Sequence, residues 1–508
     1  MNTTLHRAAI RCLVIVAASG AAAVHAQTVT PPLTSFVNNP ATNASALQQQ
    51  AGVAVQDMCT ALGRDGGFAL AGAKQDLFLR CNEMVETART LQGGQAVFNR
   101  SLGYTNGNDL LATIQQTSGE EIAAQGTLST QVSAGQFANI SGRLTALRLG
   151  GASAAAHSRV AQLDGALSPS ELLAQGFDID QRLQLGGGAA ADAQASDPIE
   201  SRFGWFVESS YGFGDHDQTA NEDQFDFDSV SVTTGSDYNF GSSVLGVSVG
   251  YDRYTADFDS ALLVSGGDVE VEGMSGSLFG GYFGAGWTLN GIATYGSLQS
   301  DVTRRVVYAS NNAACALGCG ANRTLTGDPD GSYVALGVTV GYEFTAGGWD
   351  IAPSLSANYR DVDIDGYDET DTSNGGLALR YEEQSIKSTR SILSLGFARP
   401  ISRSFGVLMP TLRLEWHHEF EDDPRSVRAK YVLEDTLTTG ASGAQDFACS
   451  ISCFTMLSDP VDADFGVAAL GLSTTFAQRM QFYLIYEALL GTANLSSNSI
   501  ALGLRGQF

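Results

Sequence analysis

Alternation of apolar residues with polar or small residues dominates the chain after residue 201. Near its end, Ile500, Leu502 and Leu504 occupy every second position, and small or polar residues lie between them. Because successive side chains of a strand point to opposite faces, such a segment predicts a β-strand with one apolar face. Twelve segments follow this pattern, at residues 202–212, 228–240, 243–255, 268–283, 286–300, 332–346, 348–362, 383–398, 404–420, 464–477, 479–491 and 498–508.

The connections between these segments alternate in length. After the second, fourth, sixth, eighth and tenth segments the chain turns within a few residues, whereas most connections after the odd segments are long and acidic. Short turns at one end and long loops at the other are typical of an even-stranded outer-membrane barrel. Closing the sheet removes its edges, and lipid covers the apolar face. We therefore predict an all-β transmembrane barrel of twelve antiparallel strands over residues 201–508, surrounded by outer-membrane lipid.

The first 200 residues have a different composition. Residues 1–26 carry Arg7 and Arg11 ahead of a short apolar run, which predicts a cleaved signal peptide. Residues 27–182 are rich in Ala, Gln and Leu at helical spacing, so we expect a mainly α-helical exported domain. Residues 183–200 are rich in Gly and Ala, which indicates a flexible linker before the barrel.

Net charge and cysteine content limit the binding partners and the bonds that this chain can form. The net charge of -26 argues against nucleic acid as a partner, and no motif points to a bound cofactor. Six cysteines remain after removal of the signal peptide, and in an exported chain we expect them to form local disulfides. A metal site at the two C-x3-C pairs is the less favoured alternative, because no histidine lies near either pair. The three pairs are Cys59 with Cys81, Cys315 with Cys319, and Cys449 with Cys453.

Two local patterns resemble known functional motifs. An acidic stretch repeats the first half of a calcium loop, with Asp361, Asp363 and Asp365 at ligand positions. Thr372 replaces the closing Glu of such a loop, so a solvated acidic loop is the favoured interpretation. Ser248 lies in a G-x-S-x-G pattern, but a catalytic serine of this type needs a strand-turn-helix and this one falls within an alternating segment. With no catalytic constellation in the sequence, we do not expect an enzyme.

The order of signal peptide, helical segment, linker and final barrel ending on Phe508 resembles the autotransporters, or type V secretion proteins. The resemblance covers residues 200–508. It implies the outer membrane of a Gram-negative bacterium, a helix that threads the pore, and handling by periplasmic chaperones and the barrel assembly machinery. It also implies that Phe508 belongs to the signal which that machinery reads. No Asn occurs between Gly151 and Ser201, so the Asn-dependent self-cleavage of some family members is not expected and the passenger should stay attached.

Charged residues on the lumen-facing side of the predicted strands are candidates to grip such a pore helix. The alternative is that they hydrate and cross-brace the pore. They are Glu208, Glu343, Arg360, Arg390, Arg413, Glu415, Glu487 and Arg505.

Two functions from different classes remain open from the sequence. The first is an autotransporter whose barrel anchors and translocates a short helical passenger that stays attached and is displayed at the cell surface for binding or adhesion. The sequence does not identify the passenger's ligand. The second is an outer-membrane channel or pore protein with a periplasmic or plugging helical domain.

Deletion of Phe508 is expected to reduce insertion of the barrel into the outer membrane, because the resemblance assigns this aromatic to the assembly signal. The measurement is the amount of heat-modifiable, folded barrel in outer-membrane fractions of cells that produce the parent chain or the deletion variant at equal levels. Equal amounts of folded barrel would contradict the assignment.

Overall fold

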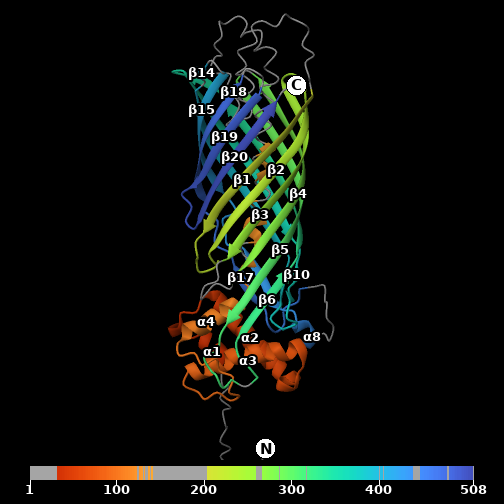
Figure 1. Cartoon of the computed structure of the whole chain (residues 1–508), viewed down its shortest axis with the longest axis vertical. Helices are drawn as coiled ribbons and strands as arrows, with labels where there is room; N and C mark the ends of the chain where they lie inside the picture. Colours follow the sequence, from red (N-terminus) through yellow and green to blue (C-terminus); the bar gives the residue numbers. More distant parts are fainter. Residues whose placement is uncertain are drawn as a thin grey trace, which may run out of the picture.

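The computed structural model describes residues 31–140 and 203–506 (Figure 1). Short gaps in this description fall at 120, 123–124, 130, 132–134, 138, 259–265, 285, 316, 400, 404–405, 439–446 and 477–479. A long β-barrel makes up most of the molecule, and a group of helices lies at one of its ends. Among the described helices, none is long and apolar enough to cross a membrane.

Twelve antiparallel strands form a closed barrel, which confirms the predicted fold class. Sequential strands pair with one another, and the first strand closes the ring by pairing with the last, from Ser209 opposite Leu502 to His216 opposite Leu495. The barrel strands are β1 (Phe203–His216), β2 (Phe225–Asn239), β3 (Ser243–Phe258), β4 (Gly267–Gly284), β5 (Trp287–Tyr308), β7 (Asp330–Tyr342), β9 (Trp349–Ile364), β13 (Gln384–Ala398), β15 (Gly406–Glu419), β18 (Asp464–Phe476), β19 (Met480–Leu490) and β20 (Leu495–Gly506).

The outward face of the barrel is apolar and the inward face is polar or small. In β5, Leu289 and Tyr295 are exposed, whereas Thr288 and Thr294 are buried and face inward. The same alternation runs round the wall, so the exposed band suits a hydrocarbon surrounding. Other exposed residues of the band are Val207, Tyr211, Leu245, Val247, Leu278, Val338, Leu355, Leu414, Leu470, Leu484 and Leu502.

Several strands run past this apolar band at the long-loop end. The acidic stretch that was predicted to be a loop begins as part of β9, where Asp361 and Asp363 pair with residues of both β7 and β13. That part of the loop prediction was wrong, because the hydrogen-bonded ladder continues on both sides of the stretch. A second sheet, in the order β10-β12-β16-β17, forms at this end. The shorter elements are β6 (Ala321–Gly327), β8 (Phe344–Ala346), β10 (Tyr367–Asp368), β11 (Thr370–Asp371), β12 (Leu379–Tyr381), β14 (Ile401–Arg403), β16 (Ser426–Tyr431), α8 (Glu434–Thr438) and β17 (Phe454–Leu457).

A small helical domain precedes the barrel. Its elements are α1 (Pro32–Val37), η1 (Pro40–Thr42), α2 (Ala46–Asp65), η2 (Gly67–Ala69), α3 (Gly72–Leu91) and α4 (Gly107–Gln116). Helix α2 begins with a capping box, in which Ser45 and Gln48 satisfy each other's backbone N–H groups. Cys59 of α2 and Cys81 of α3 are disulfide-bonded, with their Cα atoms 5.5 Å apart. Around this bond the apolar faces of the helices form a buried core that includes the fully buried Met58.

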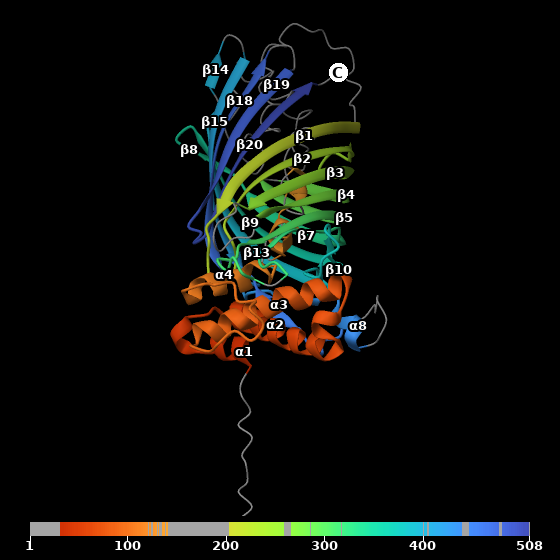
Figure 2. The same cartoon turned by 60° about the horizontal axis from the view of Figure 1, so that its bottom comes forward.

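The helical domain lies across the long-loop end of the barrel (Figure 2). Helix α2 contacts β17 and α8, and α4 contacts β5. The short turns, such as the one at Gly347 and Gly348, connect strands at the other end. In the described part of the chain the two ends of the barrel therefore differ, because the helical domain covers the long-loop end.

Arginine on the two faces of the barrel wall should have very different effects. Leu484 is exposed on the apolar face, so Leu484→Arg should cost about 2–4 kcal/mol of folding free energy near the middle of the bilayer. Ser356 faces the lumen, and Ser356→Arg should cost much less. Urea unfolding of the two variants in lipid vesicles, followed by heat-modifiable gel mobility, measures the difference. Similar losses at the two positions would mean that the facing assignment is wrong.

Candidate functional site at the docking face and in the barrel lumen

Helix α3 carries a row of charged residues that faces the barrel. Asp76, Arg80 and Glu83 are four and three residues apart, which places them on one side of the helix. Asp76 accepts a 2.7 Å hydrogen bond from Arg323 of β6 and a 3.1 Å hydrogen bond from the backbone N–H of Gly376. A single carboxylate therefore ties α3 to two separate segments of the long-loop end.

Glu83 is the centre of a buried ion cluster. Its side chain has no exposed surface, and it pairs with Arg80 at 2.8 Å and with Arg100. From the barrel chain, the Tyr308 hydroxyl and the Gly320 backbone N–H donate to the same carboxylate at 3.3 Å and 3.1 Å. Burial raises the pKa of Glu83 to about 7 against the opposing effect of the two arginines, and burial also lowers the pKa of Arg100. Charges this far from water require every partner to be present, so the cluster depends on the docked arrangement.

The end of α4 is held at the mouth of the barrel. Arg304 of β5 is buried, forms two hydrogen bonds with Glu369 and donates to the Gln116 carbonyl at 3.3 Å. Farther along the chain, Arg425 donates to the Thr127 hydroxyl at 2.7 Å. Two guanidinium groups from the barrel side thus fix the segment that leads from the helical domain into the lumen.

After this segment the chain continues into the lumen as a helix (Figure 2). The Gln136 amide donates to Asp252 of β3 at 2.7 Å and accepts from the Thr233 hydroxyl of β2 at 2.8 Å. Asn139 donates to the same Thr233 hydroxyl at 2.7 Å. Because the two amides lie three residues apart on one helix face, this part of the lumen helix is attached to the wall at β2 and β3.

Two glycines in the wall make room for this helix, whose described residues fall within 122–140. A Cβ atom on Gly250 of β3 would collide with the Gln136 side chain, and one on Gly337 of β7 would collide with the Phe137 ring. The wall and the helix are therefore matched in shape as well as in hydrogen bonding. This close fit indicates that the barrel is built around an occupied lumen.

A cavity of about 1040 Å³ remains beside the lumen helix. Ser, Thr and Asn side chains line much of it, mixed with charges. Of the predicted lumen residues, Glu343 is buried but does not line this cavity, and the side chain of Arg505 lies outside the described residues. The predicted residues that line the cavity are Glu208, Arg360, Arg390, Arg413, Glu415 and Glu487.

Some of these cavity charges pair with other charges of the wall. Arg390 of β13 contacts Glu419 of β15 at 3.2 Å, and Arg413 of β15 contacts Glu487 of β19. The Gln136 and Asn139 amides of the lumen helix are hydrogen-bonded instead to hydroxyls and a carboxylate of β2 and β3, which the sequence analysis did not single out. The signal was present in the GQFANI stretch, where two amides three residues apart share a helix face.

The two C-x3-C pairs are separate disulfides at the long-loop end. Cys315 and Cys319 lie between β5 and β6 with their Cα atoms 5.9 Å apart. Cys449 and Cys453 precede β17, with a Cα separation of 5.5 Å. With each sulfur bonded to its near neighbour, the two pairs do not combine into a metal site.

The calcium pattern has no built site in the described part of the chain. Asp361 and Asp363 lie on β9, and Asp361 accepts a 2.9 Å hydrogen bond from the Tyr359 hydroxyl. No group of three or more His, Cys, Asp or Glu side chains in the described ranges is arranged to hold a metal ion. Asp365 follows the strand as an exposed residue, and Phe508 lies outside the described residues.

A closed twelve-stranded barrel with a helix in its lumen defines the class of outer-membrane translocator domains. The family model of the autotransporter beta-domain matches residues 205–487, which is more than half of the chain. The chain therefore belongs to the autotransporter family. It is an outer-membrane protein of a Gram-negative bacterium.

Curated relatives match over part of their length. A Pseudomonas putida protein described as "Uncharacterized protein in trpE-trpG intergenic region" is 31% identical over 167 residues, 32% of this chain and 25% of that protein. "Esterase EstA" of Pseudomonas aeruginosa is 29% identical over 217 residues, 40% of this chain and 31% of that protein. The match thus spans less than a third of the length of these relatives.

Solved structures that resemble this chain include two translocator units of autotransporters. The translocator domain of NalP from Neisseria meningitidis has a TM-score of 0.42 at 14% identity, covering 60% of this chain and 88% of that chain. The transport unit of AIDA-I from Escherichia coli has a TM-score of 0.42 at 13% identity, covering 63% and 95%.

Asp76→Ala should weaken docking of the helical domain. It removes an acceptor from Arg323 and from the Gly376 N–H, and hydrogen bonds to charged groups contribute roughly 1.5–3 kcal/mol each. We expect proteolysis of the α3–α4 connection in the full chain, in detergent micelles, to become faster by about tenfold or more. Asp65→Ala is the matched control, because Asp65 is 43% exposed and pairs with Lys74 at the surface, where ion pairs contribute about 0–1 kcal/mol. Equal cleavage rates for the two variants would show that Asp76 does not hold the interface.

Proposed function

We propose that this autotransporter translocates its helical domain and keeps it attached at the cell surface as a folded cap on its own pore. Residues 31–117 form the displayed passenger, and the barrel is its anchor. The passenger serves in binding or adhesion. Periplasmic chaperones and the barrel assembly machinery, which the family resemblance implies, are its assembly partners.

The single observation that carries this proposal is the position of the helical domain relative to the two ends of the barrel. It packs on the long-loop end through Asp76 and the Glu83 cluster, while the following helix lies in the lumen. β1 begins at Phe203, whose partner Tyr238 adjoins the short turn between β2 and β3. In barrels of this type long loops are extracellular and short turns periplasmic. The described part of the lumen helix follows the helical domain at the long-loop end, and β1 begins at the short-turn end. These two positions support outward translocation.

The cavity beside the lumen helix favours a second candidate function. A volume of about 1040 Å³ lined by hydroxyls and charges suits a water-filled passage, so a pore protein plugged by its own helix is the alternative. In that case the helical domain would act as a stopper rather than as a binding module.

An enzymatic passenger is the least supported proposal. Two relatives carry the name esterase, but the match covers less than a third of their length. The Gly-Asp-Ser type motif of the esterase members is absent near the expected mature N-terminus.

Protease treatment of intact cells tests the proposal. One epitope is inserted at Gly93, which is exposed after α3, and a control epitope is inserted at Gly348 in a short turn. We expect the Gly93 epitope to be lost from intact cells and the Gly348 epitope to be lost after the outer membrane is permeabilised. The mature chain should run as one band on denaturing gels before treatment, since the passenger remains attached.

Survival of the Gly93 epitope until permeabilisation would place the helical domain in the periplasm and overturn the proposal. A separate small passenger band before protease treatment would overturn the attached state alone.

A further inference from the structure

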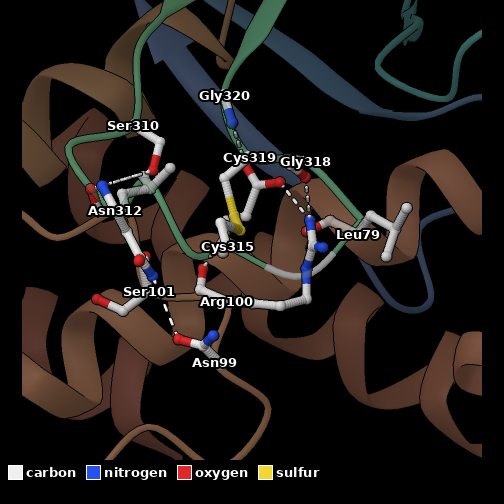
Figure 3. The surroundings of a disulfide bond; sticks show 12 residues. Leu79, Asn99, Arg100, Ser101, Ser310, Asn312, Cys315, Gly318, Cys319 and Gly320 are labelled. Atoms are coloured by element: carbon white, nitrogen blue, oxygen red, sulfur yellow. Dashed lines mark hydrogen bonds and ion pairs between the residues drawn. A yellow bond between two sulfur atoms is a disulfide. The ribbon is translucent and has the colours of Figure 1, made fainter.

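The Cys315–Cys319 disulfide closes a small ring in the connection between β5 and β6 (Figure 3). Both cysteines are partly exposed, and Leu317 at the outside of the ring is 69% exposed. The inner side of the ring faces the helical domain. A disulfide in a hydrophilic loop usually stabilises only that loop. Here the ring that it closes forms part of the interface with the helical domain.

The backbone of the ring and of the residue after it contacts the buried ion cluster of the helical domain. The Gly318 carbonyl accepts from Arg100 at 3.1 Å and from Arg80 at 3.4 Å. The Gly320 carbonyl also accepts from Arg80, and the Gly320 N–H donates to Glu83 at 3.1 Å. Two glycines therefore offer acceptors to both arginines and a donor to the carboxylate between them.

The rest of this connection also binds the helical domain. The Asn311 N–H donates to the Leu102 carbonyl at 2.7 Å, and the Asn312 amide donates to the Ser101 carbonyl at 2.9 Å. From the other side, the Asn99 amide donates to a carbonyl of the connection at 2.7 Å. The contact is a continuous row of hydrogen bonds between two irregular segments, so it depends on both segments holding their shape.

The conformation that presents these groups is one that an open peptide seldom adopts. Leu317, Gly318 and Gly320 have φ angles of 61°, 74° and 93°, all in the left-handed region. A non-glycine residue is disfavoured in that region, and two glycines add conformational entropy to the open state. A covalent closure restricts the alternatives and so keeps the carbonyls aimed at the arginines.

The other C-x3-C ring has the same size but a different role. In the ring of Cys449 and Cys453, the backbone N–H groups of Ser450 and Ser452 donate to Glu434 at 2.9 Å and 2.7 Å. Glu434 belongs to α8 of the same long loop. That ring orders its own loop, whereas the Cys315–Cys319 ring holds a different domain.

We propose that the Cys315–Cys319 ring is a redox-dependent receptor for the helical domain. In the disulfide form it holds Arg80 and Arg100, and the domain stays docked. In the dithiol form the ring opens, the two carbonyls lose their fixed direction and the domain is released from the barrel mouth. The reductant is a small thiol or dithiol: two thiols transfer two electrons and two protons, the Cys315–Cys319 bond breaks to two thiols, and the reductant leaves as its own disulfide.

Docking of the helical domain on this ring does not depend on which side of the membrane the domain occupies. It is therefore tested on the purified full chain in detergent micelles, so that its failure and a failure of the proposed display are separate results.

The experiment is hydrogen exchange of α3 in three proteins: the parent, Cys315→Ser/Cys319→Ser, and the control Cys449→Ser/Cys453→Ser. Loss of one hydrogen bond to a charged group corresponds to roughly tenfold or more in the open population. We expect α3 of the first variant to exchange at least about tenfold faster than the parent, with the β13 and β15 peptides unchanged. The control variant should match the parent at α3.

A second measurement needs no variant. Dithiothreitol at graded concentration should raise α3 exchange in the folded parent, and removal of the reductant with reoxidation should restore it. Alkylation and mass spectrometry identify which pair has opened; the Cys59–Cys81 pair is buried and should be reduced last. Reduction should have no further effect in Cys315→Ser/Cys319→Ser.

Three results would overturn the inference. One is parent-like α3 exchange in Cys315→Ser/Cys319→Ser while the barrel remains folded. Another is an equal rise in the Cys449→Ser/Cys453→Ser control. The third, which holds even if the variant fails to fold, is unchanged α3 exchange in the parent after alkylation shows that Cys315 and Cys319 are reduced.

Discussion

The hydrogen-bonding needs of the backbone in lipid set the architecture of this chain. No water is present in the hydrocarbon region to satisfy a free N–H or carbonyl, so an open sheet would leave two unpaired edges there. The pairing of β1 with β20 removes both edges, and every other feature of the barrel follows from that closure. Once the barrel is closed, successive side chains of each strand point alternately to the lipid and to the lumen. The alternation of exposed and buried residues in β5 meets that requirement.

Closure also creates an interior that must be filled or hydrated. The inner wall is polar, so it cannot be filled by apolar packing as the core of a small soluble barrel is. The lumen helix meets it with amides: Gln136 and Asn139 bind hydroxyls and a carboxylate of β2 and β3. Gly250 and Gly337 let that helix approach the wall, and a cavity lined by hydroxyls and charges remains beside it. A helix that is narrower than its barrel leaves such a space beside it.

The parts that could be predicted from sequence are those with a repeated physical signal. The twelve strands were found because alternation of period two repeats over many residues, and the antiparallel order followed from turn length. The row of charged residues on α3 was not predicted to contact the barrel, because Asp76, Arg80 and Glu83 look like the solvated face of a surface helix. Their contacts depend on residues more than two hundred positions away in the chain. The length of β5 was underestimated for a related reason. Its outer part loses the apolar face that marks a membrane strand, while Val302 and Val306 of its inward face are buried beyond the membrane.

The interface between the helical domain and the long-loop end of the barrel contains a buried charged cluster beside its apolar contacts. Desolvation of Glu83, Arg80 and Arg100 costs nearly as much as their mutual attraction returns, so such a cluster contributes orientation more than affinity. An interface of this kind is sensitive to the direction of each acceptor, because a carbonyl turned away leaves a buried guanidinium unsatisfied. Directional acceptors are best supplied by backbone that cannot rearrange. A disulfide-closed ring with left-handed residues in it and directly after it provides that rigidity. The charged row on α3 and the cysteine spacing between β5 and β6 are therefore two halves of one device, although neither motif indicates the other in the sequence.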